Sequence, residues 1–386
     1  MPHIVMDHAS LGENLTQETT QILFEAVGDK ERLVAVSTDH TPLLFRIVGR
    51  PGRYVIKCDK STRIPDTNMI KRTLNRLGTL YNGTIIQSNI AIVKDDLIDP
   101  FLVNPSFFLS PLEGYRTMWI EVGFGSGRHL LEQAKLNPDV LVIGIEIHKP
   151  SLEQVLRRCK ADNITNIRVI DFDARLLLQF IQSQHVEKIF VHFPIPWGKA
   201  VHRRVISAHF LDEAMRVLIP QGRLELRTDD EDYFRDSFEL MLKYATAHLE
   251  IKKNADTIVS SKYEDRWKRQ SKTIYDLHMI NVTPDTTERQ TFTFDFPPHA
   301  PSSLSHLPAK PLVDPDNGAV LHFMRTYTIG ATQGSLTEVV LGAFDRPERK
   351  FIHITGDQVS YFPAPPLGVK ENFIAHQTLV KVLYGN

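Results

Sequence analysis

The sequence predicts an α/β protein whose central domain has a parallel β-sheet and whose two ends are rich in β-strands. The first observation is that short apolar runs alternate with segments of helical periodicity between residues 115 and 280, as in βαβ units. The second is a glycine-rich turn that directly follows the first of these runs. The third is that both flanks hold short strand-like segments separated by turn dipeptides, which is typical of β-rich domains.

Length and composition limit the class of protein. The chain has 386 residues, of which 42% are apolar and 24% charged, so about two to three globular domains are expected. No apolar run approaches the roughly 20 residues that cross a membrane, and the start resembles no secretion signal. Cys58 and Cys159 are the only cysteines, too few for a disulfide framework or a four-cysteine zinc site. We therefore expect a cytoplasmic protein that binds neither a membrane nor a metal.

Residues 1–114 are expected to form a β-rich N-terminal extension. Pro51-Gly52 and Asn82-Gly83 predict turns within it, because these dipeptides favour tight chain reversals. A short helix is expected near residues 68–77, and prolines around residues 104–111 predict a linker at its end. The expected strands are residues 33–36, 43–48, 54–58 and 84–87.

Residues 115–280 are expected to form the central domain. Its strands are predicted from mainly apolar runs, which indicate a parallel sheet that is buried on both faces. The expected strands are residues 118–122, 140–147, 167–170, 189–193 and 223–228. Helical patterns separate them near residues 128–137, 149–161, 174–183 and 205–218.

Residues 281–318 are expected to form a linker, because six prolines lie between Pro297 and Pro315. Residues 319–386 again appear β-rich in the sequence pattern, with strands at 323–328 and 338–341 and a final amphipathic helix at 373–384. The two β-rich flanks could pair into one domain or form two, and the sequence leaves the oligomeric state open.

A glycine-rich loop joins the first central strand to its helix. Gly123, Gly125 and Gly127 let the backbone turn tightly and approach a ligand at the helix N-terminus. The dinucleotide fingerprint needs a third glycine at a position where this chain has Arg128. Glu121, two residues before the first glycine, is poorly placed for a pyrophosphate and suits a cationic amine. A tight turn without a ligand is the alternative.

Two more carboxylates follow the next two strands. Glu146 ends the second strand, where an acidic residue can accept hydrogen bonds from both ribose hydroxyls. Asp173 follows the third strand and could accept one from an adenine amino group. Each alone is explained as a helix cap or a surface charge. Together with Glu121 they predict a nucleoside ligand with an amino acid tail and no phosphate, S-adenosyl-L-methionine.

The loop after the fourth strand is stiff and basic. Pro194 and Pro196 restrict its backbone, and Trp197 can stack on a flipped base. Basic side chains that can hold phosphates follow it, and the alternative is a rigid turn in which the tryptophan only packs. These side chains are Lys199, His202, Arg203 and Arg204.

Six motifs over roughly residues 117–280 together resemble one family. They are Ile120–Gly127, Gly144–His148, Asn166–Val169, Phe193–Lys199 with His202–Arg204, Thr228–Asp229, and Ser261–Glu264. The family is that of the bacterial tRNA (guanine-N7)-methyltransferases. The resemblance implies a Rossmann-like class I S-adenosylmethionine-dependent methyltransferase domain. It also implies methyl transfer to N7 of a guanosine in the tRNA variable loop, with S-adenosyl-L-homocysteine as the other product.

The resemblance also implies roles for residues. Glu121, Glu146 and Asp173 would contact the cofactor, whereas tRNA would be contacted by Lys199, Asp229, Ser261, Lys262, Tyr263 and Glu264. One departure is that Ile195 stands between the two prolines, where the family usually has an aspartate. The catalytic residue is therefore unassigned, and we expect an active enzyme without a dedicated general base because N7 carries a free lone pair.

The net charge of −1 excludes a wholly basic nucleic-acid-binding protein. The charges are nevertheless unevenly distributed along the chain. Residues 199–227 and 252–272 carry a net charge of +7, so the rest of the chain carries −8. Basic side chains near Tyr263 and Trp267 suit phosphate contacts with base stacking, although a solvated helix face is the alternative. We therefore expect tRNA to bind these segments rather than the flanks.

Three other functions remain as alternatives. The first is a catalytically weakened, tRNA-binding scaffold protein, which Ile195 allows. The second is an NAD-dependent oxidoreductase, which Arg128 disfavours. The third is methylation of another acceptor such as an exocyclic amine, because a short proline-aromatic loop at this position serves that chemistry too.

Overall fold

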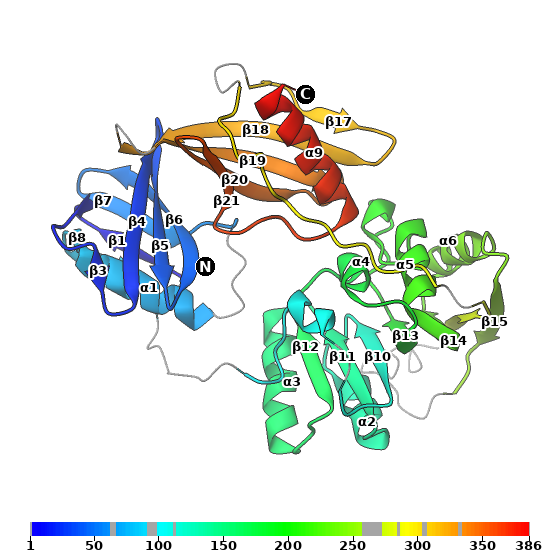
Figure 1. The fold of residues 1–386 in the computed structure, drawn as a ribbon. Helices are drawn as coiled ribbons and strands as arrows, with labels where there is room; N and C mark the ends of the chain where they lie inside the picture. Colours follow the sequence, from blue (N-terminus) through cyan, green and yellow to red (C-terminus); the bar gives the residue numbers. More distant parts are fainter. Residues whose placement is uncertain are drawn as a thin grey trace. The chain divides into compact units, whose positions relative to one another are not determined.

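The computed structural model describes residues 2–61, 67–90, 99–110, 113–256, 272–283, 286–302, 307–330 and 334–385. The chain divides into two compact units (Figure 1). One combines Met1–Leu97 with Thr291–Asn386, and the other is Ile98–Gln290. The two β-rich flanks therefore share one unit, which is one of the two arrangements that the sequence leaves open. Residues 98–114 and 281–290, which we expected outside the central domain, belong to the second unit.

The second unit is built on a seven-stranded sheet in the order β12-β11-β10-β13-β14-β16-β15. The first five strands in chain order are parallel, whereas β16 is antiparallel to both β14 and β15. The bounds are β10 Thr117–Val122, β11 Val140–Ile145, β12 Ile167–Ile170, β13 Val186–His192, β14 Leu218–Thr228, β15 Ala247–Lys253 and β16 Tyr275–Asn281. The five expected parallel strands are confirmed, but the pattern did not predict β15 or β16.

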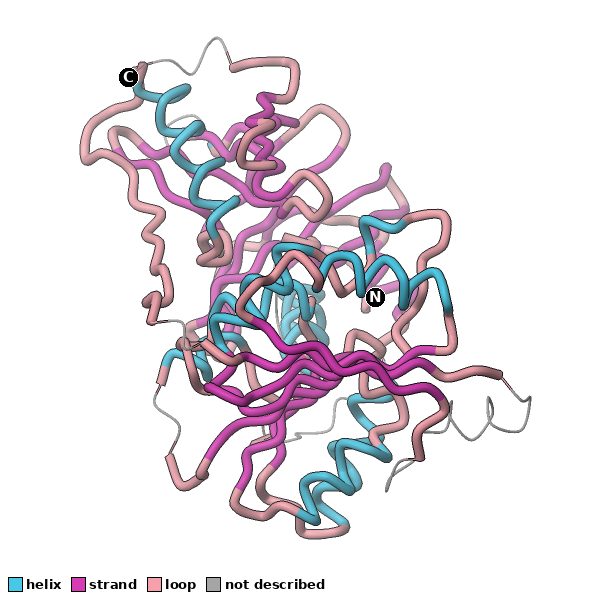
Figure 2. Tube along the Cα trace, turned by 90° about the vertical axis from the view of Figure 1, so that its right-hand side faces the viewer, coloured by secondary structure: helices cyan, strands magenta, loops and turns pink. Residues whose placement is uncertain are grey.

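Helices cover both faces of this sheet (Figure 2). The helices expected near 128–137, 149–161 and 205–218 are confirmed. The one expected near 174–183 is a short helix that continues into a 3₁₀ turn. The bounds are α2 Arg128–Leu136, α3 Lys149–Ala161, α4 Ala174–Leu177 with η2 Leu178–Phe180, α5 Ala208–Val217 and α6 Glu231–Met241. Two further 3₁₀ turns are η1 Pro105–Leu109 and η3 Val201–Arg203.

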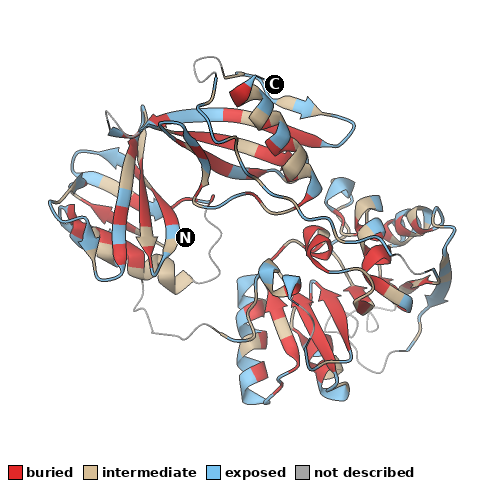
Figure 3. Cartoon of the chain, in the orientation of Figure 1, coloured by how far each residue is buried: buried red, intermediate tan, exposed pale blue. Residues whose placement is uncertain are grey.

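The central strands β10 and β11 form because most of their side chains are apolar. Every residue of β10 and β11 is buried (Figure 3), as expected for strands between two helical layers. Gly144 in β11 lets α2 approach closely, because a Cβ atom there would lie 2.6 Å from Leu130 and 2.7 Å from Phe124. The chain order of the strands reverses between β10 and β13, which places a crevice at their carboxyl ends.

The first unit is built on a twelve-stranded antiparallel sheet to which both chain ends contribute, and two short N-terminal strands form a separate pair. Strand β18 of the C-terminal end pairs with β4 of the N-terminal end at Thr328 and Val27. N-terminal bounds are β1 His3–Met6, β2 Ser10–Leu11, β3 Thr16–Gln17, β4 Thr20–Val27, β5 Glu31–Thr38, β6 Thr41–Arg50, β7 Arg53–Cys58, α1 Thr67–Leu80, β8 Tyr81–Asn82 and β9 Ile85–Ser88. C-terminal bounds are β17 Leu312–Asp314, β18 Ala319–Thr328, β19 Ser335–Ala343, β20 Glu348–Thr355, β21 Gln358–Phe362 and α9 Lys370–Tyr384.

The core of the first unit also crosses the two chain ends. Ala26 and Leu33 share one buried cluster with Tyr327, Phe351 and Phe362. Because these residues exclude water jointly, neither end can complete this core alone.

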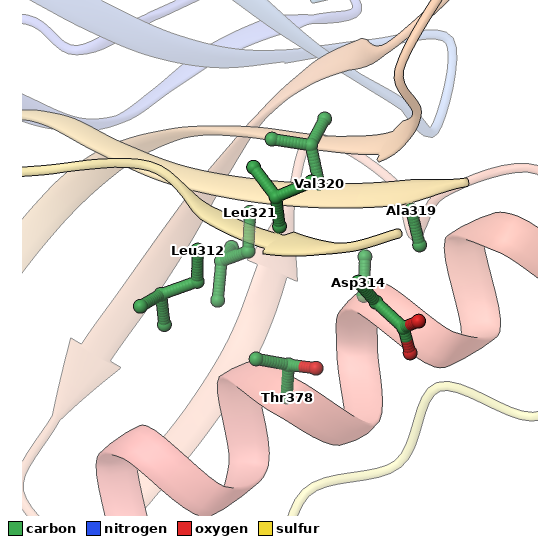
Figure 4. Close-up of a pocket in the computed structure, with 8 residues that line it drawn as sticks. Leu312, Asp314, Ala319, Val320, Leu321 and Thr378 are labelled. Atoms are coloured by element: carbon green, nitrogen blue, oxygen red, sulfur yellow. The ribbon is translucent and has the colours of Figure 1, made fainter. Parts of the chain in front are cut away.

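Helix α9 packs on β18 and β19 (Figure 1). A cavity of about 60 Å³ is lined by residues of β17, β18 and α9. Figure 4 shows three of these residues, Leu312, Leu321 and Thr378. Small-molecule sites are commonly several hundred cubic ångströms, so this cavity is too small for a nucleoside. Among the described residues, no helix is both long and apolar enough to cross a membrane.

Candidate active site

The glycine loop adopts the left-handed backbone conformation that its composition predicts. Gly123, Gly125 and Gly127 all have positive φ angles, of 67°, 53° and 70°, which side chains with a Cβ rarely adopt. A Cβ atom on Gly127 would lie 2.2 Å from Val155, so α2 and α3 pack closely only because it is glycine. By contrast, a Cβ atom on Gly123 would meet nothing within 4 Å. The loop therefore borders open space at the end of β10.

Glu146 is fixed beside this loop. Its Oε2 accepts a hydrogen bond of 3.0 Å from the backbone N–H of Gly125. Its Oε1 accepts bonds of 2.9 and 3.0 Å from the N–H groups of Ile147 and His148. A carboxylate has about four lone-pair sites, so Glu146 can still accept a bond from a ligand. The structure thus brings the two predicted motifs of β10 and β11 together.

Glu121, in β10 two residues before the glycine loop, is only 4% exposed. Its Oε2 lies 2.8 Å from Nδ1 of His129, which is 7% exposed. A buried carboxylate is tolerated only when it is hydrogen bonded or paired. His129 was not predicted as a site residue, because a histidine in the first turn of a helix resembles a surface residue.

Asp173 caps α4 and is engaged by a neighbour. It accepts a hydrogen bond from the backbone N–H of Arg175 at 3.0 Å, and the guanidinium of that residue contacts its Oδ2 at 2.7 Å. Asp171, two residues earlier, has its pKa raised by burial, an effect that Lys149 opposes. The end of β12 therefore carries two carboxylates in different electrostatic settings.

The loop after β13 has an unusual backbone. Phe193 and Trp197 both have positive φ angles, of 49° and 45°, a conformation that bulky residues adopt only where surrounding contacts impose it. The backbone N–H of Phe193 donates to the carbonyl of Arg227 on β14 at 2.7 Å. Ile195 projects from this loop with 64% of its surface exposed. Strained backbone of this kind is found mainly at functional sites.

The basic residues of this loop do not all face solvent. Lys199, His202 and Arg203 are exposed, and the Arg203 guanidinium lies 5.1 Å from the centre of the Trp197 ring. Arg204 is only 4% exposed, so it is not available to phosphates in this structure, contrary to our expectation from the sequence.

Arg204 instead holds the loop from inside. Its Nε donates to the carbonyl of Pro196 at 2.6 Å, and its guanidinium pairs with Asp236 of α6. The same group lies 4.8 Å from the centre of the Tyr233 ring. The physical reason for its burial is that the carbonyl of Pro196 and the carboxylate of Asp236 satisfy its donors.

Asp229 follows β14 and pairs with Lys272, with Nζ and Oδ2 2.6 Å apart. The next residue, Asp230, caps α6 by accepting a bond of 2.7 Å from the N–H of Tyr233. The other expected tRNA contacts, Ser261, Lys262, Tyr263 and Glu264, lie outside the described residues.

A polar cavity of about 300 Å³ lies on one face of the sheet beside this site. Arg227 and Asp276, both buried, form an ion pair of 2.6 Å at its wall. His192 and His278 also line it, and burial lowers the pKa of both, that of His192 strongly. Alternating charged side chains in an otherwise apolar strand, as in residues 223–227, could have predicted that one face of the sheet is polar. Our prediction of a sheet with two apolar faces did not include this feature.

Comparisons with known proteins cover nearly the whole chain. A family described as putative methyltransferase matches residues 115–277. A tRNA (guanine-N(7)-)-methyltransferase of Wolinella succinogenes is 38% identical over 90% of this chain and 90% of its own length. One of Helicobacter hepaticus is 34% identical over 99% of both chains. Both flanks are therefore shared with these relatives.

Among solved structures, a 16S rRNA (adenine(1408)-N(1))-methyltransferase from Catenulisporales acidiphilia is 19% identical. It covers 50% of this chain and 99% of its own, with a TM-score of 0.37. Among the described residues of the present chain, no three or more His, Cys, Asp or Glu side chains gather as a metal site.

Proposed function

Because the chain belongs to the tRNA (guanine-N(7)-)-methyltransferase family, we propose that it methylates N7 of a guanosine in the variable loop of tRNA. It is an S-adenosylmethionine-dependent RNA methyltransferase. The observation that carries the proposal is that the glycine loop after β10 and the strained Pro194–Trp197 loop after β13 follow adjacent parallel strands. Val122 and Val191, near the ends of these strands, are direct register partners.

The crevice suits S-adenosylmethionine. Bound there, this cofactor supplies a methyl group that its sulfonium already activates. Glu121 offers a buried carboxylate to the ammonium of the amino acid tail, and Glu146 offers its remaining acceptor site to the ribose hydroxyls. The open space over Gly123 leaves room for the ligand to contact the loop backbone. Asp173, which Arg175 orients, would accept from the adenine amino group.

The residues of the site position the reactants and remove no proton. The N7 lone pair of guanine forms the new bond to carbon, and the electron pair of the broken carbon–sulfur bond stays on sulfur. No base is required before attack, so correct alignment supplies most of the rate. This accounts for Ile195 at the position where the resemblance implies an aspartate, and it leaves the catalytic residue unassigned.

The proposed tRNA surface surrounds the strained loop. Trp197 and Arg203 form a cation–π pair whose ring can stack on a base. Lys199, Lys252 and Lys253 are exposed and can contact phosphates. By family resemblance, His202, Asp229 and residues 261–264 extend this surface, although residues 261–264 lie outside the described residues.

Methyl transfer to bulk tRNA tests the proposal. Purified protein would be mixed, in excess, with labelled S-adenosylmethionine and tRNA that lacks the modification, and the methylated nucleoside would be identified by mass spectrometry. We expect 7-methylguanosine in the variable loop and none when that guanosine is replaced by adenosine. A methyl group on an exocyclic amine, or tRNA binding without any transfer, would refute the proposal. Binding of tRNA without transfer would favour a tRNA-binding scaffold protein, an alternative that only Ile195 supports.

A further inference from the structure

A buried carboxylate–imidazole pair lies behind the glycine loop. Glu121 comes from β10 and His129 from the first turn of α2, and their side chains are 5% and 8% exposed. Nδ1 of the imidazole lies 2.8 Å from Oε2 of the carboxylate. Nε2 of the same ring lies 3.1 Å from the side-chain nitrogen of Gln133, one turn further along α2.

The contact with Glu121 determines which ring nitrogen carries a proton. A carboxylate has no proton to donate, so Oε2 of Glu121 accepts in the contact of 2.8 Å. Nδ1 therefore carries the proton and donates to Glu121 Oε2. The histidine thus acts as a donor that occupies one oxygen of the carboxylate while the other remains for a ligand, and Gln133 contacts its second ring nitrogen.

The imidazole is also held by its neighbours. Its ring packs edge-on against Phe190, with centroids 4.9 Å apart, and tilts against His192 at 4.8 Å. Burial holds the pKa of His192 well below its usual value, so this second ring is neutral near pH 7 and does not repel a donor beside it. The pair is therefore confined on both sides by uncharged rings.

We propose that His129 is a positioning residue for cofactor recognition. It fixes the Glu121 carboxylate in one orientation, with Oε1 directed to the ammonium of the amino acid tail of S-adenosylmethionine. Without this donor, a buried carboxylate would lose a hydrogen bond, and both its orientation and its negative charge would be less favourable. The inference rests on the proposed function, because it needs a ligand whose ammonium meets Glu121.

Two ligands separate positioning from simple packing. S-adenosylhomocysteine carries the ammonium, whereas 5′-methylthioadenosine has the same nucleoside and thioether without it. Calorimetric titration of His129→Leu should show S-adenosylhomocysteine binding weakened about tenfold to hundredfold, as for a lost hydrogen bond to a charged group. Affinity for 5′-methylthioadenosine should stay within about twofold. Equal losses for both ligands, or no loss for either, would overturn the proposal.

Two further variants keep the test decisive. His129→Asn places an amide nitrogen near the position of Nδ1 and should recover most of the lost affinity. Gln133→Leu removes the partner of Nε2 without touching the pair, and should cost a smaller part of the affinity for S-adenosylhomocysteine alone. Both remain informative if His129→Leu fails to fold, and a Gln133→Leu loss that is shared by 5′-methylthioadenosine would contradict the proposal.

A double-mutant cycle checks that His129 acts through Glu121. In the Glu121→Gln background, His129→Leu should cause no additional loss of S-adenosylhomocysteine affinity, because the charge that it orients is gone. Additive losses would show a separate structural role. Methylation of tRNA by the unsubstituted protein is measured independently, so failure of this inference is distinguishable from failure of the proposed function.

Discussion

Ile195 distinguishes this site from the family pattern, in which an aspartate usually stands between the two prolines. It lies between Pro194 and Pro196 with 64% of its surface exposed, and its side chain can neither accept nor donate a proton. Methylation of a ring nitrogen with a free lone pair needs no proton transfer before attack. An aliphatic residue is therefore compatible with catalysis by alignment.

Replacing Ile195 by alanine should leave catalysis nearly intact. Because the side chain is exposed, we expect unfolding free energy within about 0.5 kcal/mol of the original and single-turnover methyl transfer within about fivefold. Ile195→Asp is the matched variant, and its carboxylate should raise the rate by up to about a hundredfold if it stabilises the cationic product. A far larger loss in Ile195→Ala, with tRNA and cofactor affinity unchanged, would mean that the isoleucine itself aligns the reactants.

His192 makes stability depend on pH. Burial lowers its pKa well below the usual 6.5, so between these values the unfolded chain binds a proton that the folded chain does not. The buried, neutral imidazole makes its full contribution to the free energy of unfolding above about pH 6.5. As the pH falls, the unfolded chain gains a proton, so this contribution declines by up to about 1.4 kcal/mol per pH unit. Urea unfolding between about pH 7.5 and 5.5 should therefore show a slope that His192→Leu reduces. The exposed His248 gives a control, since His248→Leu should leave the slope unchanged.

At the scale of elements, the strained loop after β13 is supported by α6. Arg204 donates to the carbonyl of Pro196 and pairs with Asp236, while its guanidinium packs on Tyr233. Asp230 in turn caps α6 directly after β14. The loop is thus supported by α6, the helix that follows β14.

Substitution of Arg204 should separate support of the loop from contact with tRNA. Arg204→Met removes the donor to Pro196, and we expect a loss of about 1–3 kcal/mol in unfolding free energy. The misplaced loop should lower kcat about a hundredfold while cofactor affinity is retained. Its exposed neighbour provides the control, since Arg203→Met should weaken tRNA binding without changing stability. If Arg204→Met resembled Arg203→Met in both respects, the phosphate contact expected from the sequence would be correct.

At the scale of the whole molecule, charge separates the proposed tRNA surface from the rest. Two segments carry +7 while the remainder carries −8, so tRNA is attracted to one region and repelled elsewhere. We expect tRNA affinity to fall about tenfold to hundredfold between about 50 and 200 mM salt, as for several phosphate contacts. Filter binding at graded salt measures this slope, and a flat dependence would count against the surface.

The second whole-molecule feature is that both chain ends complete one unit. Arg46 on β6 lies at the joint, paired with Glu31, with Asp59 at 2.8 Å and with Glu338 of β19 at 3.7 Å. All three carboxylates are less than a tenth exposed. The relatives of Wolinella and Helicobacter match 90% and 99% of this chain, so both flanks have counterparts in their sequences.

Arg46→Met should destabilise this unit as a whole. Removing Arg46 takes away the guanidinium that pairs with buried Asp59, which costs up to about 3–5 kcal/mol. Glu31 and Glu338 keep their contacts with Arg325 and Arg349. We expect trypsin cleavage sites in both chain ends to lose their protection at the same urea concentration, and this concentration should be lower than in the original protein. Arg325→Met is the control, because Arg325 is 60% exposed at the same network and should cost less than about 1 kcal/mol. Loss of protection in only one end would contradict a common core.

Much of the second unit could be predicted because its strands are apolar along their length. Residues 167–170 were predicted with the observed bounds, and β10 and β11 differ by only a few residues. Strand β15 was missed because the prediction followed continuous apolar runs, whereas Ala247, Leu249 and Ile251 alternate with polar residues and most of the strand is exposed. It is a strand only because β16 pairs with it.

The sequence by itself determined the α/β class, the glycine loop, and the order of Glu121, Glu146 and Asp173 along successive strands, because local periodicity and spacing encode these features. Only the tertiary structure decided which polar side chains turn inward. Arg204 became a support for the loop and His129 a partner of Glu121, since each meets a complementary group from an element distant in sequence. It also decided that residues 1–97 and 291–386 complete one core. The physical reason is that burial and pairing depend on neighbours across the fold, whereas a linear pattern records only neighbours along the chain.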